Sequence, residues 1–365
     1  MIRILKISPH LTARTVKQIE SLLAYSSVHV TLFVKAKFLS LLTPLANQPQ
    51  LDIIPYNFHR NMLRRLMFRK IFVTYSRTAD IIHCHNEPNY HIVDAIRANK
   101  FNKPVIFDVH DLTSSRTGRI NHREKYAYQF SDFILHVSPE FIQIGEDYFG
   151  KRPANFLYSS TSEQNIIEKP RQTLDTGEIH FAYQGGIYDP QWAGKLKYSY
   201  RNYLQIFREI LEEGHHLHVF TQVPLSRLPS YAELTNTFSR FHFQGYSEYT
   251  TLLEKLSRCD IGIAGFNPAN MTSAARQYLN GAIGNKLFDY LSAGLPVVVT
   301  NAVAMARFVS EYRCGAVKDD FHSWAETVSR IPATNIARVA KATSSEKQAD
   351  KLLSIYANLL DRTID

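Results

Sequence analysis

The segment 284–300 contains the residues whose types and spacing most clearly suggest chemistry. Gly284 and Asn285 open a predicted short helix, and a later glycine and proline end it before a buried strand. A helix N-terminus beneath a glycine offers backbone N–H groups and a positive dipole end, which suit a diphosphate. Lys286 adds a positive charge, and Asp289 carries a carboxylate that can accept hydrogen bonds from ribose hydroxyls. The pattern predicts a nucleotide site, although a plain surface helix with a Lys/Asp pair explains it equally well.

A second group of polar residues follows a predicted strand at residues 105–109. Asp108 and His110 are two positions apart, so they share one side of this strand near its carboxyl end, and Asp111 follows in the turn. An imidazole beside carboxylates suits proton transfer or contact with a charged substrate. The structural alternative is that Asp111 caps the next turn and His110 is a half-buried imidazole of the core.

The predicted strand 80–84 leads into another histidine motif. His83 and His85 share one face of the strand, and together with Glu87 they could begin a metal site. Because no further ligands accompany them, we expect no metal here. His85 and Asn86 are instead expected to line a substrate pocket, with a packed strand end as the alternative.

No metal site is expected elsewhere in the chain. His215, His216 and His218 stand where a predicted helix gives way to a strand, and they suit the negative end of a helix dipole. The three cysteines are far apart and offer neither zinc spacing nor a disulfide framework. We therefore expect reduced thiols in a cytoplasmic protein.

Parallel β-sheets must position these residues. Short apolar runs alternate with segments of helical period, which is typical of α/β domains. The 365 residues exceed what one hydrophobic core usually supports, so we expect two domains. The predicted fold class is α/β, with two Rossmann-like doubly wound domains facing a cleft. Ligands of such sheets bind beyond the carboxyl ends of the strands.

The predicted strands form two series separated by a polar segment that contains Pro170. The first series comprises residues 2–7, 28–34, 80–84, 105–109 and 133–137, and the second comprises 180–183, 216–221, 241–244, 260–263, 297–300 and 315–318. The expected organisation is an N-terminal domain at 1–165, a linker at 166–178, a C-terminal domain at 179–343 and a final helix at 344–365, which can pack back on the N-terminal domain.

The segment 284–300 resembles the donor-site signature of GT-B glycosyltransferases, particularly family-4-like enzymes of bacterial surface polysaccharide synthesis. In that family a stretch similar to Asn-Lys-x-x-Glu-Tyr-x-x-x-Gly-x-Pro-Val runs from helix to strand, as residues 285–297 do here. Other segments agree in order and spacing across nearly the whole chain. They are the His-x-His strand, the strand ending in His110 and Asp111, the loop with Gly185 and Gly186, and the loop with Gly245 and Tyr246.

The resemblance implies a glycosyltransferase that moves a sugar from a nucleotide-sugar donor to a glycan or lipid-linked glycan acceptor. The donor is expected in the C-terminal domain and the acceptor on the N-terminal domain. Because no Asp-x-Asp motif occurs, we expect no metal ion and no other cofactor. The expected donor-binding residues are Gly185, Gly186, Gly245, Tyr246, Gly284, Asn285, Lys286 and Asp289. One basic residue among Lys195, Lys197 and Arg201 is also expected on the phosphates.

The same resemblance assigns roles to the residues near the acceptor. His110 is expected to contact the transferred sugar or the leaving phosphate. Asp108 or Asp111 is the expected base if the reaction inverts the sugar. His85 and Asn86 are expected to line the acceptor pocket.

Two departures from the family pattern leave other functions open. Asp289 stands where the second of two family glutamates lies, and Gly281 stands eight residues earlier, where the first would approach the transferred sugar. A non-catalytic GT-B glycan-binding or partner subunit is therefore an alternative. A nucleotide-sugar epimerase of the same architecture is a weaker one.

The stretch 56–79 contains six Lys/Arg and no acidic residue, with apolar residues at roughly helical spacing. It predicts a basic helix lying on an anionic membrane surface, with packing on its own domain as the alternative. The net charge of +9 also favours anionic partners. No nucleic-acid-binding motif accompanies this positive charge.

The sequence contains no signal peptide and no 18-residue apolar run. We therefore expect a cytoplasmic protein that is peripheral on the inner face of the plasma membrane.

Overall fold

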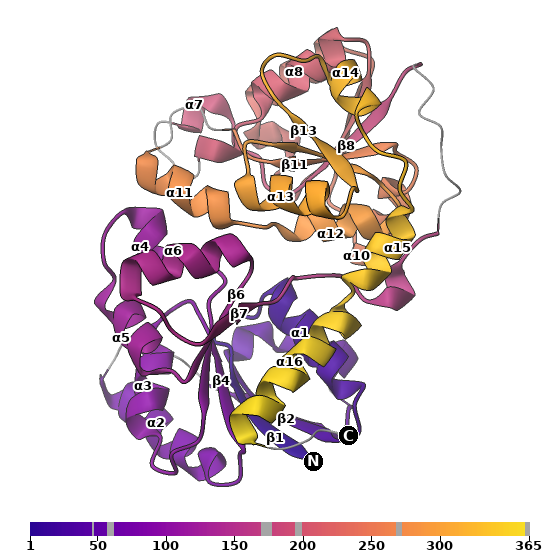
Figure 1. The fold of residues 1–365 in the computed structure, drawn as a ribbon. Helices are drawn as coiled ribbons and strands as arrows, with labels where there is room; N and C mark the ends of the chain where they lie inside the picture. Colours follow the sequence, from indigo (N-terminus) through magenta and orange to yellow (C-terminus); the bar gives the residue numbers. More distant parts are fainter. Residues whose placement is uncertain (46, 57–61, 169–176, 194–198, 268–271, 362–365) are drawn as a thin grey trace. The chain divides into compact units, whose positions relative to one another are not determined.

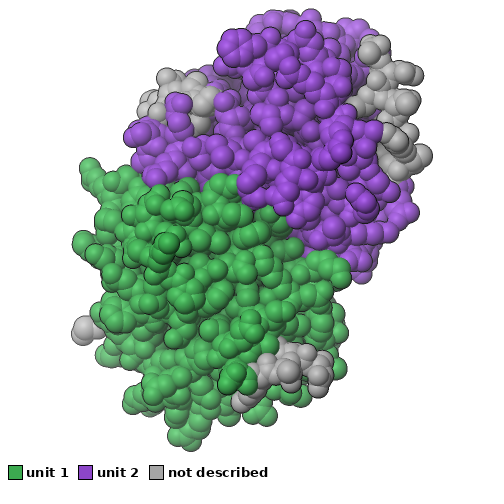
Figure 2. Space-filling model, in the orientation of Figure 1, with its two compact units in different colours: residues 1–159, 345–365 green, residues 160–344 purple. Residues whose placement is uncertain are grey.

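The computed structural model describes residues 1–45, 47–56, 62–168, 177–193, 199–267 and 272–361. The chain divides into two compact units: unit 1, residues 1–159 with 345–365, and unit 2, residues 160–344 (Figure 2). Each unit is built on one parallel sheet, which confirms the predicted α/β fold class with two doubly wound domains (Figure 1). The units divide ahead of the predicted boundary at 165, and most of the predicted linker 166–178 lies outside the described residues.

Unit 1 contains a seven-stranded parallel sheet in the order β3-β2-β1-β4-β5-β6-β7. Its strands are β1 (Ile2–Ile7), β2 (Val28–Val34), β3 (Leu51–Pro55), β4 (Ile81–His85), β5 (Val105–Asp108), β6 (Phe133–His136) and β7 (Ala154–Phe156). The strand order reverses between β1 and β4. At such a switch point the loops leave in opposite directions and open a crevice beyond the carboxyl ends of the strands.

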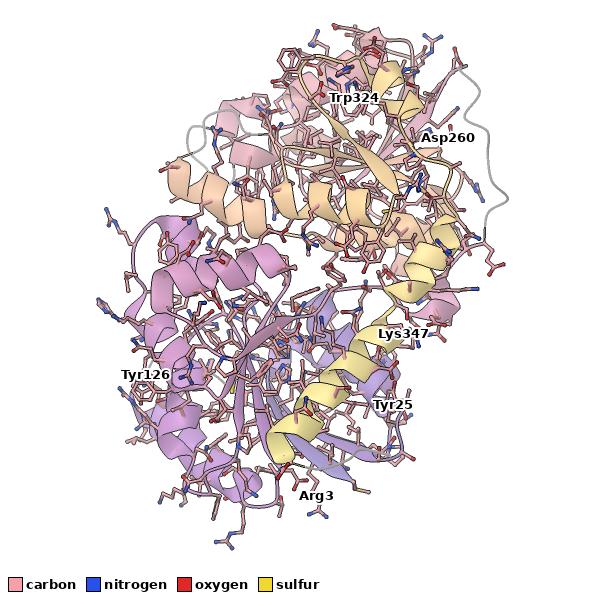
Figure 3. All side chains as sticks on the ribbon, viewed as in Figure 1. Arg3, Tyr25, Tyr126, Asp260, Trp324 and Lys347 are labelled. Carbon is pink, nitrogen blue, oxygen red and sulfur yellow. The ribbon has the colours of Figure 1, made fainter. Side chains whose placement is uncertain are left out.

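The helices of unit 1 include the last helix of the chain. They are α1 (Ala13–Leu23), α2 (Met62–Ser76), α3 (Tyr90–Ala98), α4 (Thr113–Thr117), α5 (His122–Phe130), α6 (Pro139–Phe149) and α16 (Ser345–Leu360), with a 3-10 segment at Ala36–Leu45. Leu352 and Tyr356 of α16 are buried in the apolar cluster that also holds Ile19 of α1. The Tyr25 hydroxyl, labelled in Figure 3, donates to Asp350 of α16. Helix α16 is therefore part of the unit 1 core.

Unit 2 contains a six-stranded parallel sheet in the order β10-β9-β8-β11-β12-β13, with its switch point between β8 and β11. The strands are β8 (His180–Gln184), β9 (His216–Phe220), β10 (Phe241–Gly245), β11 (Ile261–Gly265), β12 (Val297–Thr300) and β13 (Gly315–Lys318). The helices are α7 (Pro190–Ala193), α8 (Leu204–Glu212), α9 (Pro229–Thr237), α10 (Tyr249–Leu256), α11 (Ser273–Gly281), α12 (Asn285–Ser292), α13 (Val303–Glu311), α14 (Trp324–Ser329) and α15 (Ile336–Ala342). Short 3-10 segments lie at Glu163–Asn165, Ser199–Arg201 and Leu225–Arg227.

A close contact between Tyr290 and Gly262 fixes the position of α12 on this sheet. A Cβ atom at Gly262 would lie 2.3 Å from Cγ of the Tyr290 ring, so only glycine leaves room for the ring on β11. The Tyr290 hydroxyl accepts the Gln184 backbone N–H at 2.7 Å and donates to the Ile263 carbonyl at 3.1 Å. One side chain therefore ties α12 to both strands of the switch point.

Gly262→Ala is expected to lower the free energy of unfolding by about 1–3 kcal/mol, because the new methyl group must displace the Tyr290 ring. Urea unfolding monitored by circular dichroism measures this change. Gly177→Ala is the matched control, since nothing lies within 4 Å of a Cβ at that position. Equal stability of the two variants would contradict the expected packing.

Candidate functional site

In unit 2, the glycine loop after β8 lies against two cationic side chains. Gly185 has φ of +130°, which a side chain would strain, and a Cβ there would lie 3.3 Å from Nζ of Lys286. A Cβ at Gly186 would lie 3.1 Å from Nη1 of Arg201. The loop backbone therefore approaches both charges at the switch point of the sheet. Lys195 and Lys197, the other two basic candidates, lie outside the described residues.

Lys286 lies among aromatic rings. Its Nζ is 4.2 Å from the ring centroid of Tyr183 and 5.5 Å from that of Tyr203. Burial, together with the nearby Arg201, lowers the pKa of Lys286 to about 7. Within the described part of the chain, no carboxylate lies within ion-pairing distance of this ammonium. A desolvated cation held in this way is stabilised by an incoming anion.

The first turn of α12 adds backbone donors to these charges. Gly284 is the N-cap residue, with φ of −83° and ψ of 148°, and it has no side chain with which to cap the helix. The N–H groups of Asn285 and Lys286 therefore remain for water or a ligand, and Asn285 is exposed. Amide dipoles and two cations together form a site suited to a diphosphate.

Asp289 does not lie open to a ribose as expected. Its side chain is buried, and Oδ1 accepts hydrogen bonds from Thr161 at 3.3 Å and Tyr249 at 2.9 Å. Gln184 Nε2 donates to Oδ2 at 3.2 Å. Three side chains of unit 2 thus occupy the carboxylate, and direct contact with a ribose requires them to move. The hydrogen bond from Asp289 to a ribose therefore remains a prediction.

The second expected loop of the donor site follows β10. Gly245 has φ of +66°, and its carbonyl accepts the Thr221 N–H at 3.0 Å. The side chain of Tyr246 is 59% exposed and its hydroxyl donates to Glu248 at 2.9 Å. Tyr246 is therefore accessible, and its contact with a nucleobase remains a prediction.

In unit 1, Asp108 at the end of β5 is the centre of a buried charge cluster. Its Oδ1 accepts a hydrogen bond from Arg14 Nη2 at 3.0 Å, and its Oδ2 accepts one from Gln18 at 2.9 Å and lies 3.1 Å from His83 Nε2. Burial alone would raise the pKa of Asp108, but Arg14 and the surrounding histidines outweigh it and hold the pKa well below its usual value. Because its side chain is fully buried and paired with Arg14, Asp108 is poorly placed to take a proton from an acceptor hydroxyl. This geometry disfavours the prediction of Asp108 as a base.

His110 lies at the edge of this cluster. Its side chain is 14% exposed, and its Nε2 is 2.8 Å from Nδ1 of His85 and 3.5 Å from Oδ1 of Asp108. Burial lowers the pKa of His110 to about 3, so the ring is neutral at physiological pH. A neutral imidazole suits a hydrogen bond to a sugar hydroxyl or phosphate oxygen better than it suits proton abstraction.

His85 and Asn86 are buried, and the expectation that they line an acceptor pocket remains a prediction. The Asn86 side chain accepts the backbone N–H of His110 at 2.7 Å and donates to the carbonyl of Asp111 at 2.5 Å. Both residues therefore hold the turn that presents His110 and Asp111. The Asp111 side chain is 43% exposed, 3.6 Å from Arg116, and is the accessible carboxylate of this turn.

The same cluster brings three metal-ligating groups together. One ligand atom from each of His83, His85 and Asp108 lies within 4.8 Å of the others. Arg14 already pairs with Asp108, and the ammonium of Lys6 is buried nearby, with a pKa that burial lowers to about 7. A dication here would add charge beside two cationic side chains. The trio therefore fits internal charge neutralisation better than a metal.

Sequence reasoning missed the partners that hold these carboxylates. Arg14 and Gln18 come from α1, and Tyr249 comes from α10, all distant in sequence from the residues they bind. Only Arg14 had a local signal. It lies in the first turn of α1, where the helix dipole disfavours a cation, so its presence there indicates a compensating anion.

Comparisons with known proteins agree with this geometry. Residues 201–352 match the family model of the glucosyltransferase 3-like C-terminal domain, a range that includes Arg201, Gly245, Lys286 and Asp289. No curated protein sequence matches the chain.

Solved glycosyltransferases share the fold over both units. A Rickettsia africae glycosyltransferase superposes with a TM-score of 0.71 at 14% identity, covering 99% of both chains. Anabaena HepE in complex with UDP gives 0.67 at 14% identity, covering 98% of this chain and 99% of that one. The lipopolysaccharide outer core galactosyltransferase WaaB gives 0.67 at 14% identity, covering 97% and 99%. The predicted fold is confirmed: the chain has the GT-B fold of these solved structures, and its residues 201–352 are similar to the glucosyltransferase 3-like C-terminal domain.

Proposed function

We propose that the chain transfers a sugar from a nucleotide diphosphate sugar to a glycan or lipid-linked glycan, and that unit 2 holds the diphosphate without a metal ion. The observation that carries this proposal is the placement of Lys286 and Arg201 against the Gly185–Gly186 loop, beside the uncapped start of α12. Two cations and amide dipoles supply the charge that a metal would otherwise supply. The similarity to HepE, which was solved with UDP, makes a UDP-sugar the first candidate.

We expect the following roles for the residues of each unit. The bond between the sugar C1 and the diphosphate oxygen breaks, and negative charge develops on the departing diphosphate, where Lys286 and Arg201 stabilise it. The acceptor hydroxyl forms the new bond to C1 and loses its proton. In an inverting reaction Asp111 takes that proton, because Asp108 is sequestered by Arg14. His110 contributes a hydrogen bond to the sugar or phosphate as a neutral ring.

The direct test is titration of the purified chain with UDP, GDP and CMP in EDTA, followed by assays of nucleotide release from the corresponding sugars. The proposal expects one nucleotide to bind and its sugar donor to turn over without added metal. Folded protein that binds no nucleotide would overturn it. Binding of a glycan alone would favour a non-catalytic subunit, and C2 inversion of the donor, seen by NMR, would favour an epimerase.

The pH dependence of donor use is expected to report Lys286. Because the pKa of this lysine lies at about 7 in the free protein, its ammonium is lost as the pH rises above 7. Donor kcat/KM should then fall by about tenfold per pH unit above that point. In Lys286→Arg the guanidinium stays protonated, so the profile should be flat from pH 7 to 9. Parallel profiles for the two proteins would contradict this role.

Helix α2 supports a membrane-bound acceptor, because Leu66 and Met67 are exposed beside Arg64 and Lys70, whereas Phe68 is buried in unit 1. Arg65 and Arg69 both bind Asp94 of α3, at 2.7 and 2.5 Å. Leu66 and Met67 are 52% and 53% exposed. This arrangement suits an anionic bilayer surface, with exposed basic residues beside the apolar ones. Residues 57–61 of the predicted stretch 56–79 lie outside the described residues.

We propose that α2 brings the enzyme to a lipid-linked glycan of surface polysaccharide synthesis, at the inner face of the plasma membrane. Within the described part of the chain, no helix has the length and apolar character needed to cross a bilayer. Contact through α2 would therefore be peripheral.

The double variant Leu66→Glu/Met67→Glu is expected to weaken binding to vesicles with 30% phosphatidylglycerol by more than tenfold, because two apolar side chains no longer enter the interface. Co-sedimentation measures the bound fraction. Ile120→Glu, which alters an exposed apolar residue of unit 1 outside α2, is the control. If both proteins sediment like the unaltered chain, α2 does not bind membranes.

A further inference from the structure

Four histidines gather on one face of the unit 2 sheet. His180 lies on β8, His216 and His218 on β9, and His242 on β10, and the strand register places His180 opposite His216 and His218 opposite His242. The opposite face of these strands carries the apolar core, including Phe181, Leu217 and Phe241. The four rings, called here the histidine face, are half-buried.

The sequence predicted that His216 and His218 lie at the end of a helix. In the structure their rings instead lie on the sheet, in the histidine face. His215 points the other way and packs against Phe181, with ring centroids 5.6 Å apart. The alternation of side chains along β9 separates it from its two neighbours in the run. The histidine face therefore combines residues from three strands, which no local motif could show.

The imidazole nitrogens of the histidine face meet in two pairs. Nδ1 of His216 lies 2.9 Å from Nε2 of His242, and Nδ1 of His180 lies 2.9 Å from Nε2 of His218. Neighbouring rings are stacked, with His180 and His216 only 4.3 Å apart at an angle of 7°. Each pair thus joins two neighbouring strands by ring nitrogens that face each other at hydrogen-bond distance.

A carboxylate orients one of these rings. Oε2 of Glu178 lies 3.1 Å from Nε2 of His216, which favours the proton on that nitrogen and leaves the lone pair on Nδ1, facing His242. A histidine whose far nitrogen donates to a carboxylate is the usual arrangement of a metal ligand. The other carboxylate oxygen of Glu178 accepts a hydrogen bond from Arg240 at 2.5 Å, which fixes Glu178 in place.

We propose that the histidine face binds a divalent transition metal of the copper or nickel type, through Nδ1 of His216 and Nε2 of His242. Metal–imidazole bonds of about 2.0–2.1 Å place two nitrogens about 2.9 Å apart at a right angle, and about 3.4 Å apart in a tetrahedron. The observed 2.9 Å fits the right angle of square-planar or octahedral coordination, which Cu²⁺ and Ni²⁺ prefer. His180 and His218 offer a second pair with the same spacing.

Two carboxylates and one guanidinium lie around the histidine face. Arg240 brings one positive charge close by, and Glu178 neutralises it. Asp260, labelled in Figure 3, adds a carboxylate whose Oδ2 accepts the backbone N–H of His180 at 2.8 Å.

The histidine face is distinct from the proposed donor site. His180 begins β8, whereas the Gly185–Gly186 loop follows the other end of that strand. A metal here would join edge strand β10 to β9 and would take no part in sugar transfer. The proposal therefore stands or falls independently of the proposed function.

The test is titration of the tag-free full-length chain with CuCl2, followed by calorimetry and by electron paramagnetic resonance of the bound Cu²⁺. We expect stoichiometric binding with at least two nitrogen ligands in the spectrum. His216→Gln should weaken binding by more than 100-fold, and Glu178→Gln, which removes only the orienting carboxylate, by about 10–100-fold. The matched control is His29→Gln, an isolated histidine in unit 1 whose Nε2 is 2.8 Å from Asp52.

Three outcomes would overturn the proposal. In the first, the unaltered chain binds Cu²⁺ no more tightly than the His216→Gln/His242→Gln double variant. In the second, the spectrum shows fewer than two nitrogen ligands on the bound Cu²⁺. In the third, the His29→Gln control loses as much Cu²⁺ affinity as His216→Gln. Binding that persists unchanged in the double variant would place the metal elsewhere, for instance at the His83, His85 and Asp108 trio. Far-ultraviolet circular dichroism of each variant shows that the fold is retained.

Discussion

Lys286→Met is expected to lower kcat/KM for the sugar donor by about 10²–10³-fold, because one of the two described cations at the glycine loop is lost where charge develops on the leaving diphosphate. Methionine preserves the length and most of the apolar volume of the lysine stem, so it still fills the space beside Tyr183 and Tyr203, and only the cation–π contacts of the ammonium are lost. Steady-state assays at pH 6.5, where the wild-type ammonium is largely protonated, measure the difference.

The stability of Lys286→Met distinguishes a role of Lys286 in diphosphate binding from a structural role. The pKa of Lys286 is lowered from 10.5 in an exposed lysine to about 7, so the unfolded chain holds this proton more tightly than the folded one. The charged lysine therefore costs stability below pH 7, and the cost is relieved as the pH rises towards 10.5. Lys286→Met should unfold at an equal or higher temperature than the wild type while its activity collapses.

Lys341→Met is the control for charge alone, because Lys341 pairs with the exposed Glu168 at 2.6 Å on the surface of unit 2. Its kcat/KM is expected to change less than twofold. If Lys286→Met retains full activity, or loses activity only in proportion to lost folded protein, Lys286 does not hold the diphosphate.

The secondary structure around the proposed donor site could be predicted from sequence because its information is local. The segment 284–300 contains the start of the helix, its lysine, its end and the strand that follows. The strand β12 has the predicted bounds, Val297–Thr300. The Gly185–Gly186 loop was expected from the resemblance to GT-B glycosyltransferases. Its contact with Lys286 spans about a hundred residues of sequence and needed the fold.

Features decided by tertiary packing could not be predicted. Strand β3, Leu51–Pro55, and strand β7, Ala154–Phe156, are short and lack a clear apolar run, so sequence reasoning missed both. In α2 the basic residues were expected to form the outer face, yet Arg65 points inward because Asp94 of α3 is buried beneath it. The spacing of hydrophobic residues along one helix contains no information about a charged side chain on another helix that pairs with it.

The buried cluster of unit 1 shows the same limit. Asp108 was a reasonable candidate base from its place at a strand end, but Arg14 lies 94 residues away in sequence. The ion pair with Arg14 indicates that the Asp108 carboxylate stabilises the fold, and Asp111 is the base that we propose. We therefore expect opposite effects from the two aspartates: substitution of Asp108 should lower stability, and substitution of Asp111 should lower activity.

Asp108→Asn is expected to lower the free energy of unfolding by about 3–5 kcal/mol, because it leaves the buried guanidinium of Arg14 without its counter-charge. The amide is nearly isosteric, so the loss is electrostatic. Since the pKa of Asp108 is held well below its ordinary value, its stabilising contribution is present at neutral pH and is lost only as the pH falls through that lowered value. Urea unfolding at pH 7 measures the change.

Two further variants decide whether this loss comes from the ion pair. In the double variant Arg14→Met/Asp108→Asn no buried charge is stranded, so its destabilisation should be smaller than the sum of the two single effects. Asp111→Asn should cost less than about 1 kcal/mol, because that carboxylate is half-exposed and 3.6 Å from Arg116. In an inverting enzyme it should nevertheless abolish transfer. A stable Asp108→Asn protein with no activity would return Asp108 to the role of base, because only a chemical role could then explain the loss.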